Sequence, residues 1–354
     1  MSAMAIPAIV LGGSGYVAGE LLRLLAAHPH FKLAGVLSDS QPGERIGSAF
    51  GHLASVWPDT RFQSRSQIEE LMRELPRPAL FCAAPHGAAA ALVDSLLNIA
   101  AAAGHAPRVV DISADFRFAT QAAYEAVYKH AHGAPHRLRE FTCALPEHLT
   151  AAPTQHVAHP GCFATAILLA SVPLLKLGLI SPALFVSGVT GSTGSGRKPV
   201  EGTHHPLRHG DLYAYNALGH RHTPEVAACA LAASGVAADF AFVPHSGPFT
   251  RGIHVTVQAA LKSSRDTREV LSLLQEFYAN SPFVRVTDGA PRVKNVVTSN
   301  YAHLSAVADG RTVAVMSVVD NLTKGAAGGA VQWMNRLFDL PESSGLLAPA
   351  PGWT

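Results

Sequence analysis

Cys162 stands where a reactive thiolate forms most easily. It follows a Pro160-Gly161 turn and precedes an apolar run that begins at Phe163. The free N–H groups and the positive dipole end of a helix N-terminus favour an anion, so a cysteine there has a pKa below its usual value of about 8.5. This placement predicts a nucleophilic cysteine. A buried structural cysteine is the alternative, because free cysteine is among the most buried residue types.

Histidine is the second residue type that could do chemistry. Of the 19 histidines, five gather in one segment. They are His204, His205, His209, His220 and His222. A zinc site is one interpretation of such a cluster, but the ligand spacing is poor. Two of the five are adjacent, and neither a His-Glu-x-x-His pattern nor a cysteine pair accompanies them. The sequence therefore does not favour a metal site.

His220 and His222 lie directly before a pattern that is typical of a helix start. Thr223 suits the N-cap position and Pro224 suits the first helical position. We therefore expect both imidazoles on a short loop at a helix entrance. Histidine beside a thiol can hold the thiolate and move protons near neutral pH, which makes both residues catalytic candidates. The alternative is that they are loop histidines facing solvent.

A glycine-rich segment at residues 188–199 is the third candidate. Gly191 and Gly196 have the spacing that opens a Walker A loop. That motif requires Lys followed by Ser or Thr, whereas Arg197, Lys198 and a proline follow here, so an NTPase is not favoured. A glycine-rich loop with two cations suits an anionic ligand, either a cofactor or a phosphorylated substrate. A mobile hairpin end is the alternative.

The N-terminal segment carries a dinucleotide-binding pattern. The apolar run Ile6–Leu11 leads into Gly13-x-Gly15-x-x-Ala18, and Lys32–Leu37 reads as the next strand. In such a strand-turn-helix unit, glycines let the backbone approach a pyrophosphate held on the helix N-terminus. A glycine-rich turn without a ligand is the alternative.

The end of the second expected strand leaves the cofactor open. Asp39 could bind the ribose hydroxyls of NAD, whereas Ser38 and Ser40, helped by a basic side chain such as Arg45, could accept the extra phosphate of NADP. We expect NADPH to be preferred.

The remaining elements follow from hydrophobic patterning. Strands that end in loops are expected at Pro78–Ala83 and from Arg108, with an Ala-rich helix reaching about Ala103 between them. Further along, extended runs predict a mixed or antiparallel sheet flanked by helices. These runs are Leu184–Val189, Phe240–Val243, Gly252–Leu261 and Thr312–Val319, and a helix is expected over Val331–Leu337.

Composition favours a two-domain enzyme. The 354 residues are 48% hydrophobic and 15% charged, with a net charge of +2. This balance argues against nucleic acid as a partner, and no apolar run of membrane-spanning length is seen.

The four cysteines lack CxxC pairing, so neither disulfides nor a thiolate zinc site is expected. The N-terminus leads straight into the first expected strand, so we expect a cytoplasmic location.

Taken together, the motifs resemble those of N-acetyl-γ-glutamyl-phosphate reductase, a relative of aspartate-semialdehyde dehydrogenase. The resemblance runs nearly end to end. Its motifs are Gly-Gly-Ser-Gly-Tyr-Val-Ala-Gly-Glu-Leu-Leu-Arg-Leu at 12–24, Pro-His-Gly at 85–87, Ala-Asp-Phe-Arg at 114–117, Pro-Gly-Cys at 160–162, Gly-Ser-Gly-Arg at 194–197, His-Arg-His-Thr-Pro-Glu at 220–225 and Asp-Asn-Leu-Thr-Lys-Gly-Ala-Ala-Gly at 320–328.

The resemblance implies an α/β fold with two domains. A Rossmann-type dinucleotide-binding domain would span residues 1–161 and be completed by residues 326–354. A second α+β domain with a mixed or antiparallel sheet, residues 162–325, would carry catalysis and assemble the chain into a homodimer or homotetramer. The implied reaction is NADPH-dependent reduction of an acyl phosphate through a thioester on Cys162, with His220 or His222 assisting proton transfer.

The resemblance also implies binding roles. Arg117 and Arg197 are candidates for the substrate's carboxylate or phosphate. The expected NADP(H)-binding residues are Gly12, Gly13, Ser14, Gly15, Tyr16, Val17, Ser38, Ser40, Pro85, Gly194, Gly196 and Asn321.

Two departures from the family pattern bear on the substrate and the packing. Phe163-Ala164 replaces the Tyr-Pro that usually follows the family's cysteine. Residues 202–206 are similar to those of sister enzymes that reduce a carrier-linked aminoadipyl phosphate in lysine synthesis. That carrier-linked reaction is one alternative function, and a histidine-rich metallohydrolase is another. Because the basic residues are dispersed, we expect the free acetylated substrate rather than a carrier protein.

Overall fold

The structure is a computed structural model that describes residues 5–149 and 154–353, and the chain divides into two compact units. The first unit contains the chain up to Cys143, the segment ending at His159, and Ala327–Leu347. The second contains the segment from Ala144, then Pro160–Ala326, then the tail from Ala348. The domain prediction placed residues 144–149, 160–161, 326 and 348–353 in the first domain, whereas the structure groups them with the second unit.

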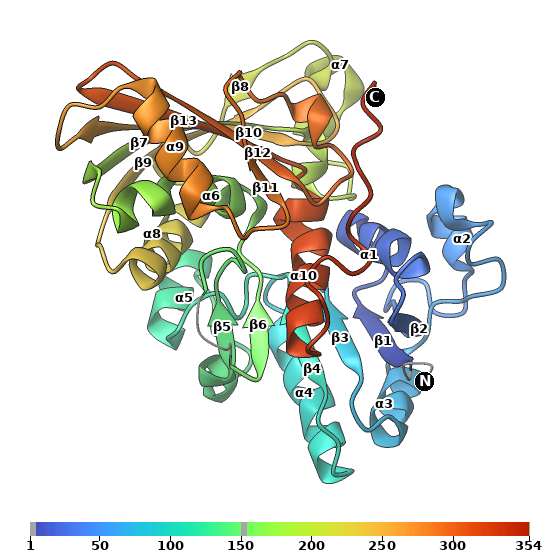
Figure 1. Cartoon of the computed structure of the whole chain (residues 1–354). Coiled ribbons are helices and arrows are strands. Elements are labelled where there is room, and N and C mark those ends of the chain that lie inside the picture. Colours follow the sequence, from blue (N-terminus) through green and yellow to red (C-terminus); the bar gives the residue numbers. More distant parts are fainter. Residues whose placement is uncertain (1–4, 150–153, 354) are drawn as a thin grey trace. The chain divides into compact units, whose positions relative to one another are not determined.

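A six-stranded parallel sheet forms the centre of the first unit (Figure 1). Its strand order is β2-β1-β3-β4-β6-β5, and every adjacent pair is parallel. The strands are β1 (Ile6–Leu11), β2 (Phe31–Leu37), β3 (Ala79–Cys82), β4 (Arg108–Asp111), β5 (Phe141–Cys143) and β6 (His156–Ala158). The fully buried β3 is apolar throughout, as strands covered on both faces must be.

Helices cover both faces of this sheet. The helices of this unit are α1 (Tyr16–Ala26), α2 (Ile46–Ala49), α3 (Arg65–Glu74), α4 (Ala89–Ala102), α5 (Gln121–Tyr128) and α10 (Gly328–Leu337). Helix α1 contacts α10, whereas α3 contacts α4, and α3 and α4 bury a shared apolar cluster with the strands. The predicted apolar face of α1 is confirmed, because Leu21, Leu22, Leu24 and Leu25 are all buried.

A seven-stranded mixed sheet forms the centre of the second unit, in the order β11-β12-β13-β10-β7-β9-β8. Its strands are β7 (Ile180–Thr190), β8 (Tyr213–Ala214), β9 (Asp239–Ser246), β10 (Ile253–Leu261), β11 (Val284–Val286), β12 (Ala302–Ala308) and β13 (Thr312–Val319). The helices of this unit are α6 (Cys162–Lys176), α7 (His205–Arg208), α8 (His222–Ser234) and α9 (Thr267–Phe277).

One face of the mixed sheet is buried and the other is exposed. Helix α6 packs on β7, β10 and β13, α8 packs on β9, and α9 packs on β11 and β12. The strands alternate accordingly: Leu184 and Val186 are buried, whereas Phe185 between them is 64% exposed. Val307 on β12 is 55% exposed. The uncovered face therefore presents large apolar side chains.

The predicted fold class is confirmed, namely a Rossmann-type parallel sheet and a second domain with a mixed sheet. Patterning did not predict β11, β12, the short edge strand β5 or its neighbour β6. Three of these have three residues each, too few for an alternating pattern to register. Within the described ranges, every helix is too short or too polar to cross a bilayer.

Several buried histidines are held neutral by the fold. His28 stacks on Phe31 with ring centroids 4.4 Å apart, and its Nε2 lies 3.1 Å from Asn335 Oδ1. Burial lowers the pKa of His28 to about 4, and it also lowers the pKa of His148 to about 4 and of His156 to about 3. Since the unfolded value is about 6.5, the unfolded chain binds more protons below that pH, and stability is lost as the pH falls from about 6.5 towards 4.

We expect the free energy of unfolding in urea to be lower at pH 5.0 than at pH 7.5, with His28 contributing about 1–2 kcal/mol of the difference. His28→Gln, which does not titrate, should reduce the difference by that amount. The half-buried neighbour His30→Gln serves as the matched control. An unchanged pH dependence in His28→Gln would contradict the assignment.

Candidate active site

Cys162 is the first residue of α6, as the sequence predicted. Gly161, the N-cap, is extended with φ −61° and ψ 161°, so its backbone turns the chain into the helix. The thiol is half-buried at the helix N-terminus, whereas Phe163 and the rest of the helix as far as Leu175 are buried. The helix dipole therefore acts on a thiol that solvent can still reach.

A buried carboxylate connects this helix start to α8. Glu225, which is fully buried, accepts a hydrogen bond from the Gly161 N–H at 2.5 Å. Helices α6 and α8 pack against each other along this contact. The sequence motif Thr-Pro-Glu was noted, but no role was predicted for its glutamate. The contact fixes the residue before Cys162 relative to α8, the helix that begins at His222.

His220 and His222 lie together and are buried, with 7% and 6% exposure. Their ring centroids are 4.8 Å apart. The His222 backbone N–H donates to His220 Nδ1 at 3.2 Å, which leaves the proton of a neutral His220 ring on Nε2. Burial, reinforced by the charge of Arg221, lowers the pKa of His220 to about 4. The His220 ring is therefore neutral near pH 7 and presents an Nε2–H donor.

Aromatic residues connect this imidazole with the thiol. The His220 ring lies 5.8 Å from Phe163, the neighbour of Cys162, and 5.7 Å from Tyr215. Burial and the charge of Cys162 raise the pKa of the Tyr215 hydroxyl well above its usual range. Tyr215 therefore shares the environment of the thiol. It was not predicted, because a tyrosine in a loop has no distinctive spacing.

The predicted cap of α8 was wrong. The helix begins at His222, one residue before the predicted N-cap Thr223, and Arg221 occupies the cap position with helical backbone angles. The Thr223 N–H donates to the His220 carbonyl at 2.9 Å, and its Oγ1 is buried with no hydrogen-bond partner among the described residues. Pro224 still lies in the first turn, where a missing N–H costs nothing. His222 is thus part of the helix rather than of the preceding loop.

Asp320 holds the turn that precedes Gly325, a residue in close contact with Cys162. Its buried carboxylate accepts two bonds from the Arg251 guanidinium, at 2.9 and 3.0 Å, and further bonds from the backbone N–H groups of Thr298, Leu322 and Thr323. The turn that it stabilises leads to Gly325. A Cβ on Gly325 would lie 2.8 Å from the Cβ of Cys162, so only glycine fits there.

Asn321, a predicted cofactor residue, has a structural role in this turn. Its Oδ1 accepts from the Gly252 N–H at 2.7 Å, and its Nδ2 donates to Thr193 Oγ1 at 3.0 Å. It therefore ties the start of β10 to the glycine-rich loop. In that loop Gly194 and Gly196 are exposed, and Gly196 is left-handed with φ +85°.

Arg197 follows on the same exposed loop and lies in the same unit as Cys162 and the two histidines. Arg117, the other predicted substrate residue, lies in the first unit and is buried. Its Nε donates to the His159 carbonyl at 3.0 Å, and an Nη donates to the Ile112 carbonyl at 2.9 Å. The structure thus shows Arg117 bracing the backbone at the ends of neighbouring strands.

The glycine-rich loop of the first unit has the shape that a pyrophosphate needs. Gly12 is left-handed with φ +82°, and a Cβ there would lie 2.6 Å from the Ala83 oxygen. A Cβ on Gly13 would lie 2.8 Å from the Leu37 oxygen, whereas the space around Gly15 is open. Gly15 caps α1 and has no side chain to occupy the first N–H groups, those of Tyr16 and Val17. These residues therefore fit a dinucleotide phosphate at the helix start.

Three serine hydroxyls lie in a row beside this loop. Ser40 Oγ is 3.5 Å from Ser14 Oγ and 3.4 Å from Ser38 Oγ. Asp39 is exposed, and Arg45 lies 3.8 Å from Asp59. The row joins the glycine-rich loop to the carboxyl end of β2, where the ribose of a dinucleotide is bound in this type of fold. Pro85 is exposed in the loop after β3, the strand next to β1.

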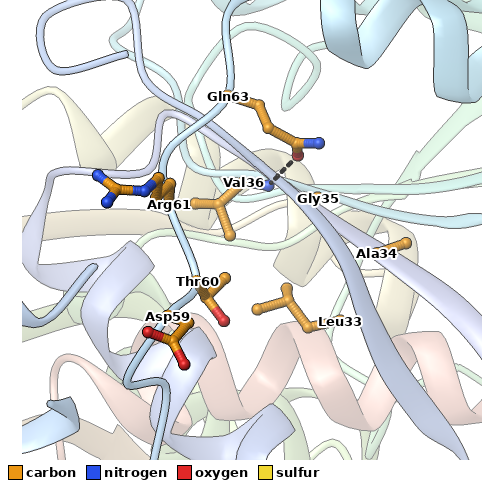
Figure 2. Close-up of a pocket in the computed structure, with 8 residues that line it drawn as sticks. All are labelled: Leu33, Ala34, Gly35, Val36, Asp59, Thr60, Arg61 and Gln63. Carbon is orange, nitrogen blue, oxygen red and sulfur yellow. Dashed lines mark hydrogen bonds between the residues drawn. The ribbon is translucent and has the colours of Figure 1, made fainter. Parts of the chain in front are cut away.

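A separate pocket of about 270 Å³ lies along the edge strand β2 (Figure 2). It is lined by Leu33, Ala34, Gly35, Val36, Asp59, Thr60, Arg61 and Gln63. Gln63 Oε1 accepts the Val36 N–H at 3.1 Å, which covers part of the open strand edge. None of the predicted site residues lines this pocket. Across residues 5–149 and 154–353, no group of three or more His, Cys, Asp or Glu side chains is arranged to hold a metal ion.

Comparison with known proteins agrees with this geometry. The family described as "Semialdehyde dehydrogenase, NAD binding domain" matches residues 7–140, and "Semialdehyde dehydrogenase, dimerisation domain" matches residues 162–321. The N-acetyl-gamma-glutamyl-phosphate reductase of Symbiobacterium thermophilum is 38% identical over 98% of this chain and 99% of its own length. The chain belongs to the N-acetyl-gamma-glutamyl-phosphate reductase family.

Further reductases of this family match the chain at similar identity. That of Nitrosococcus oceani is 38% identical over 97% of this chain and 98% of its own length. That of Methanosarcina acetivorans is 37% identical over 96% of this chain and 98% of its own. The family resemblance stated from the sequence motifs is therefore confirmed.

Solved structures of aspartate-semialdehyde dehydrogenases share the reductase fold. The Vibrio cholerae enzyme II, complexed with ASA, superposes with a TM-score of 0.67 at 14% identity and covers 95% of this chain and 99% of its own. A probable aspartate-semialdehyde dehydrogenase from Pseudomonas aeruginosa gives 0.66 at 17% identity, covering 95% and 99%. At these identities the likeness concerns the fold.

We expect Cys162 to react with iodoacetamide faster than the other three thiols at pH 7, because it combines access with a helix N-terminus. Cys143 is the matched control, since it is also half-buried but ends a strand. Mass spectrometry of the alkylated peptides, with Cys162→Ser and Cys143→Ser variants, measures both rates. Faster labelling of Cys143 would argue against an activated Cys162.

Proposed function

We propose that this chain is an NADPH-dependent oxidoreductase that converts N-acetyl-γ-glutamyl phosphate to N-acetyl-glutamate 5-semialdehyde and phosphate in arginine biosynthesis. The observation that carries the proposal is the environment of Cys162. A half-buried thiol at a helix N-terminus has a buried, neutral imidazole, packed on the adjacent Phe163, in the same unit. The names of the full-length relatives support the same reaction.

The first step forms a covalent intermediate on Cys162. The thiolate attacks the acyl carbon of the acyl phosphate, a carbon–sulfur bond forms, and the carbon–oxygen bond to phosphate breaks. Phosphate leaves with the bonding electron pair, and a thioester remains. The N–H groups in the first turn of α6 are placed to stabilise the oxyanion of this tetrahedral species.

The second step reduces the thioester to the aldehyde. Bound NADPH supplies the hydride. The backbone donors of α6 stabilise the resulting alkoxide, whose collapse releases the semialdehyde and restores the Cys162 thiolate. The reaction consumes one proton overall, which the phosphate released in the first step takes up to become hydrogenphosphate. The Nε2–H of His220 is the donor that we assign to the oxyanion, because His220 Nδ1 is already occupied by the His222 N–H.

His222 is assigned a supporting role in this hydrogen bond. Its N–H fixes the His220 ring, and its own ring packs against His220 at 4.8 Å. Arg197 is assigned to the anionic groups of the substrate, supported by its place on an exposed, glycine-rich loop. Arg117 remains a second proposed substrate residue, although its contacts in the first unit are with backbone carbonyls.

We assign NADPH binding to the first unit, which corresponds to the proposed domain 1–161 with residues 326–354. Gly12, Gly13 and Gly15 would hold the pyrophosphate, supported by the shape of their loop. Ser14, Ser38 and Ser40 would receive the 2′-phosphate, supported by the row that their hydroxyls form. Tyr16, Val17 and Pro85 are the other proposed cofactor residues of the first unit, and Gly194, Gly196 and Asn321 are proposed cofactor residues of the second unit. The proposed catalytic domain is 162–325.

We also propose that the enzyme is cytoplasmic and forms a homodimer or homotetramer, with no nucleic acid or membrane partner. The uncovered face of the seven-stranded sheet supports assembly through the second unit, because Phe185 and Val307 are exposed there. The family description of residues 162–321 as a dimerisation domain supports it too. A carrier-linked aminoadipyl reductase and a metallohydrolase are not favoured, since the relatives carry the reductase name.

The proposed reaction is tested in reverse, by following NADPH formation from N-acetyl-glutamate semialdehyde, NADP⁺ and phosphate or arsenate. We expect turnover with NADP⁺ and a higher KM with NAD⁺, because the serine row accommodates a phosphate. Forward assays with free N-acetyl-glutamyl phosphate and carrier-linked aminoadipyl phosphate at equal concentration compare the substrates. Turnover with the carrier-linked substrate alone would overturn the substrate assignment. A lower KM for NAD⁺ than for NADP⁺ would overturn the proposed preference for NADP(H).

His220→Asn should lower kcat by on the order of a hundredfold or more with little change in KM, because the Nε2–H donor is lost. His222→Asn is the matched comparison: it keeps the backbone N–H that fixes His220, so its loss should be smaller. Steady-state kinetics of both variants check this. If both remained within a few-fold of wild type, the proton donor would be another group.

A further inference from the structure

A carboxylate without an assigned role holds the Pro85–Gly87 turn in the first unit. Asp115 follows β4 and is fully buried. Its Oδ1 accepts from the Gly87 N–H at 2.8 Å and from the Tyr124 hydroxyl at 3.1 Å. Its Oδ2 accepts from the Ala90 N–H at 3.0 Å. Three donors from two segments therefore meet on one carboxylate.

Two of these donors belong to the start of α4. The N-cap residue Ala88 has no side-chain oxygen, so it cannot cap the helix itself. Asp115 supplies the missing acceptor from a different loop and places a negative charge at the positive end of α4. Gly87 is left-handed with φ +83°, a conformation that the bond from its N–H to Asp115 helps to fix. The position of the turn thus depends on Asp115.

The loop that carries Asp115 is itself rigid. The Ser113 hydroxyl donates to Asp111 at 2.8 Å and accepts from the Asp115 N–H at 3.1 Å. The Ala114 N–H donates to His86 Nδ1 at 3.0 Å, a second bond between this loop and the turn. Burial and the nearby Asp115 raise the pKa of Asp111 to about 6. The turn is therefore held at both His86 and Gly87.

The turn lies beside the glycine-rich loop. A Cβ on Gly12 would lie 2.6 Å from the Ala84 Cα, so the chain leading into Pro85 contacts the proposed pyrophosphate loop directly. Pro85, His86 and Gly87 are exposed, whereas Asp115 beneath them is buried. An exposed turn that is fixed from below presents a preformed surface to a ligand.

We propose that Asp115 is a positioning residue for the dinucleotide: through Gly87 and Ala90 it sets the Pro85–Gly87 turn against the cofactor. This inference rests on the proposed function, because it requires NADPH to bind the first unit. Asp115 acts through the turn and does not touch the cofactor.

Asp115→Asn tests the proposal. The amide replaces one acceptor oxygen with an NH₂ group, which then faces a backbone N–H or the Tyr124 hydroxyl. We expect the Kd for NADPH, measured by fluorescence titration of the full chain, to rise at least tenfold, or about 1.4 kcal/mol. The KM for NADPH should rise in parallel, with kcat at saturating NADPH within threefold of wild type.

A second test variant and a control complete the experiment. Tyr124→Phe removes one of the three donors and keeps the carboxylate and the ring, so the NADPH Kd should rise about threefold. Asp266→Asn makes the same carboxylate-to-amide change at the N-cap of α9 in the second unit, where Asp266 accepts from the Glu269 N–H at 2.8 Å. It should leave the NADPH Kd unchanged.

The outcomes separate this inference from the proposed function. If Asp115→Asn binds NADPH as tightly as wild type, the positioning role of Asp115 is overturned and the proposed function is not affected. If Asp115→Asn does not fold, Tyr124→Phe decides: a threefold rise in Kd supports the positioning role, and an unchanged Kd overturns it. A kcat loss without a Kd change in Asp115→Asn overturns it as well. Failure of the wild-type chain to bind NADPH overturns the proposed function and this inference with it.

Discussion

The hydrogen bond from the Gly161 N–H to the buried Glu225 carboxylate is the contact on which the geometry of the thiol depends. Burying a carboxylate without hydrogen-bond donors costs much free energy. Because Glu225 is fully buried, the folded state is strongly stabilised in the arrangement that keeps its bond to the Gly161 N–H. Gly161 precedes Cys162, and Glu225 follows His220 by five residues and His222 by three. One contact therefore fixes both the helix that begins with Cys162 and the helix that begins with His222.

A second buried carboxylate, Asp320, shapes the backbone that packs on the thiol. Its two oxygens are shared among the Arg251 guanidinium and three backbone N–H groups. This rigid turn brings Gly325 so close to Cys162 that a side chain at that position would overlap the Cys162 Cβ. In both cases, a buried carboxylate that accepts hydrogen bonds from backbone N–H groups holds the chain next to the thiol.

In the first unit, too, a buried carboxylate accepts backbone N–H bonds, here next to the glycine-rich loop. There Asp115 holds the start of α4, and its loop holds the turn next to the glycine-rich segment. In a parallel sheet the loops at the carboxyl edge have no ladder partners, so side-chain oxygens must supply the missing acceptors. The buried polar residues of both units therefore fix the loops at which a cofactor or a substrate would bind.

The sequence alone determined the local features: Cys162 at a helix start, the glycine-rich turn after β1, the fold class and the family. Each depends on residue types within a short window, such as Pro-Gly before an apolar run. The cap of α8, the tautomer of His220, and the roles of Glu225, Asp320 and Asp115 depended on the tertiary structure. The three carboxylates each have a partner that is distant in sequence, as with Glu225 and Gly161, which are 64 positions apart. Spacing cannot predict such a pairing, because packing decides which distant N–H a buried carboxylate meets.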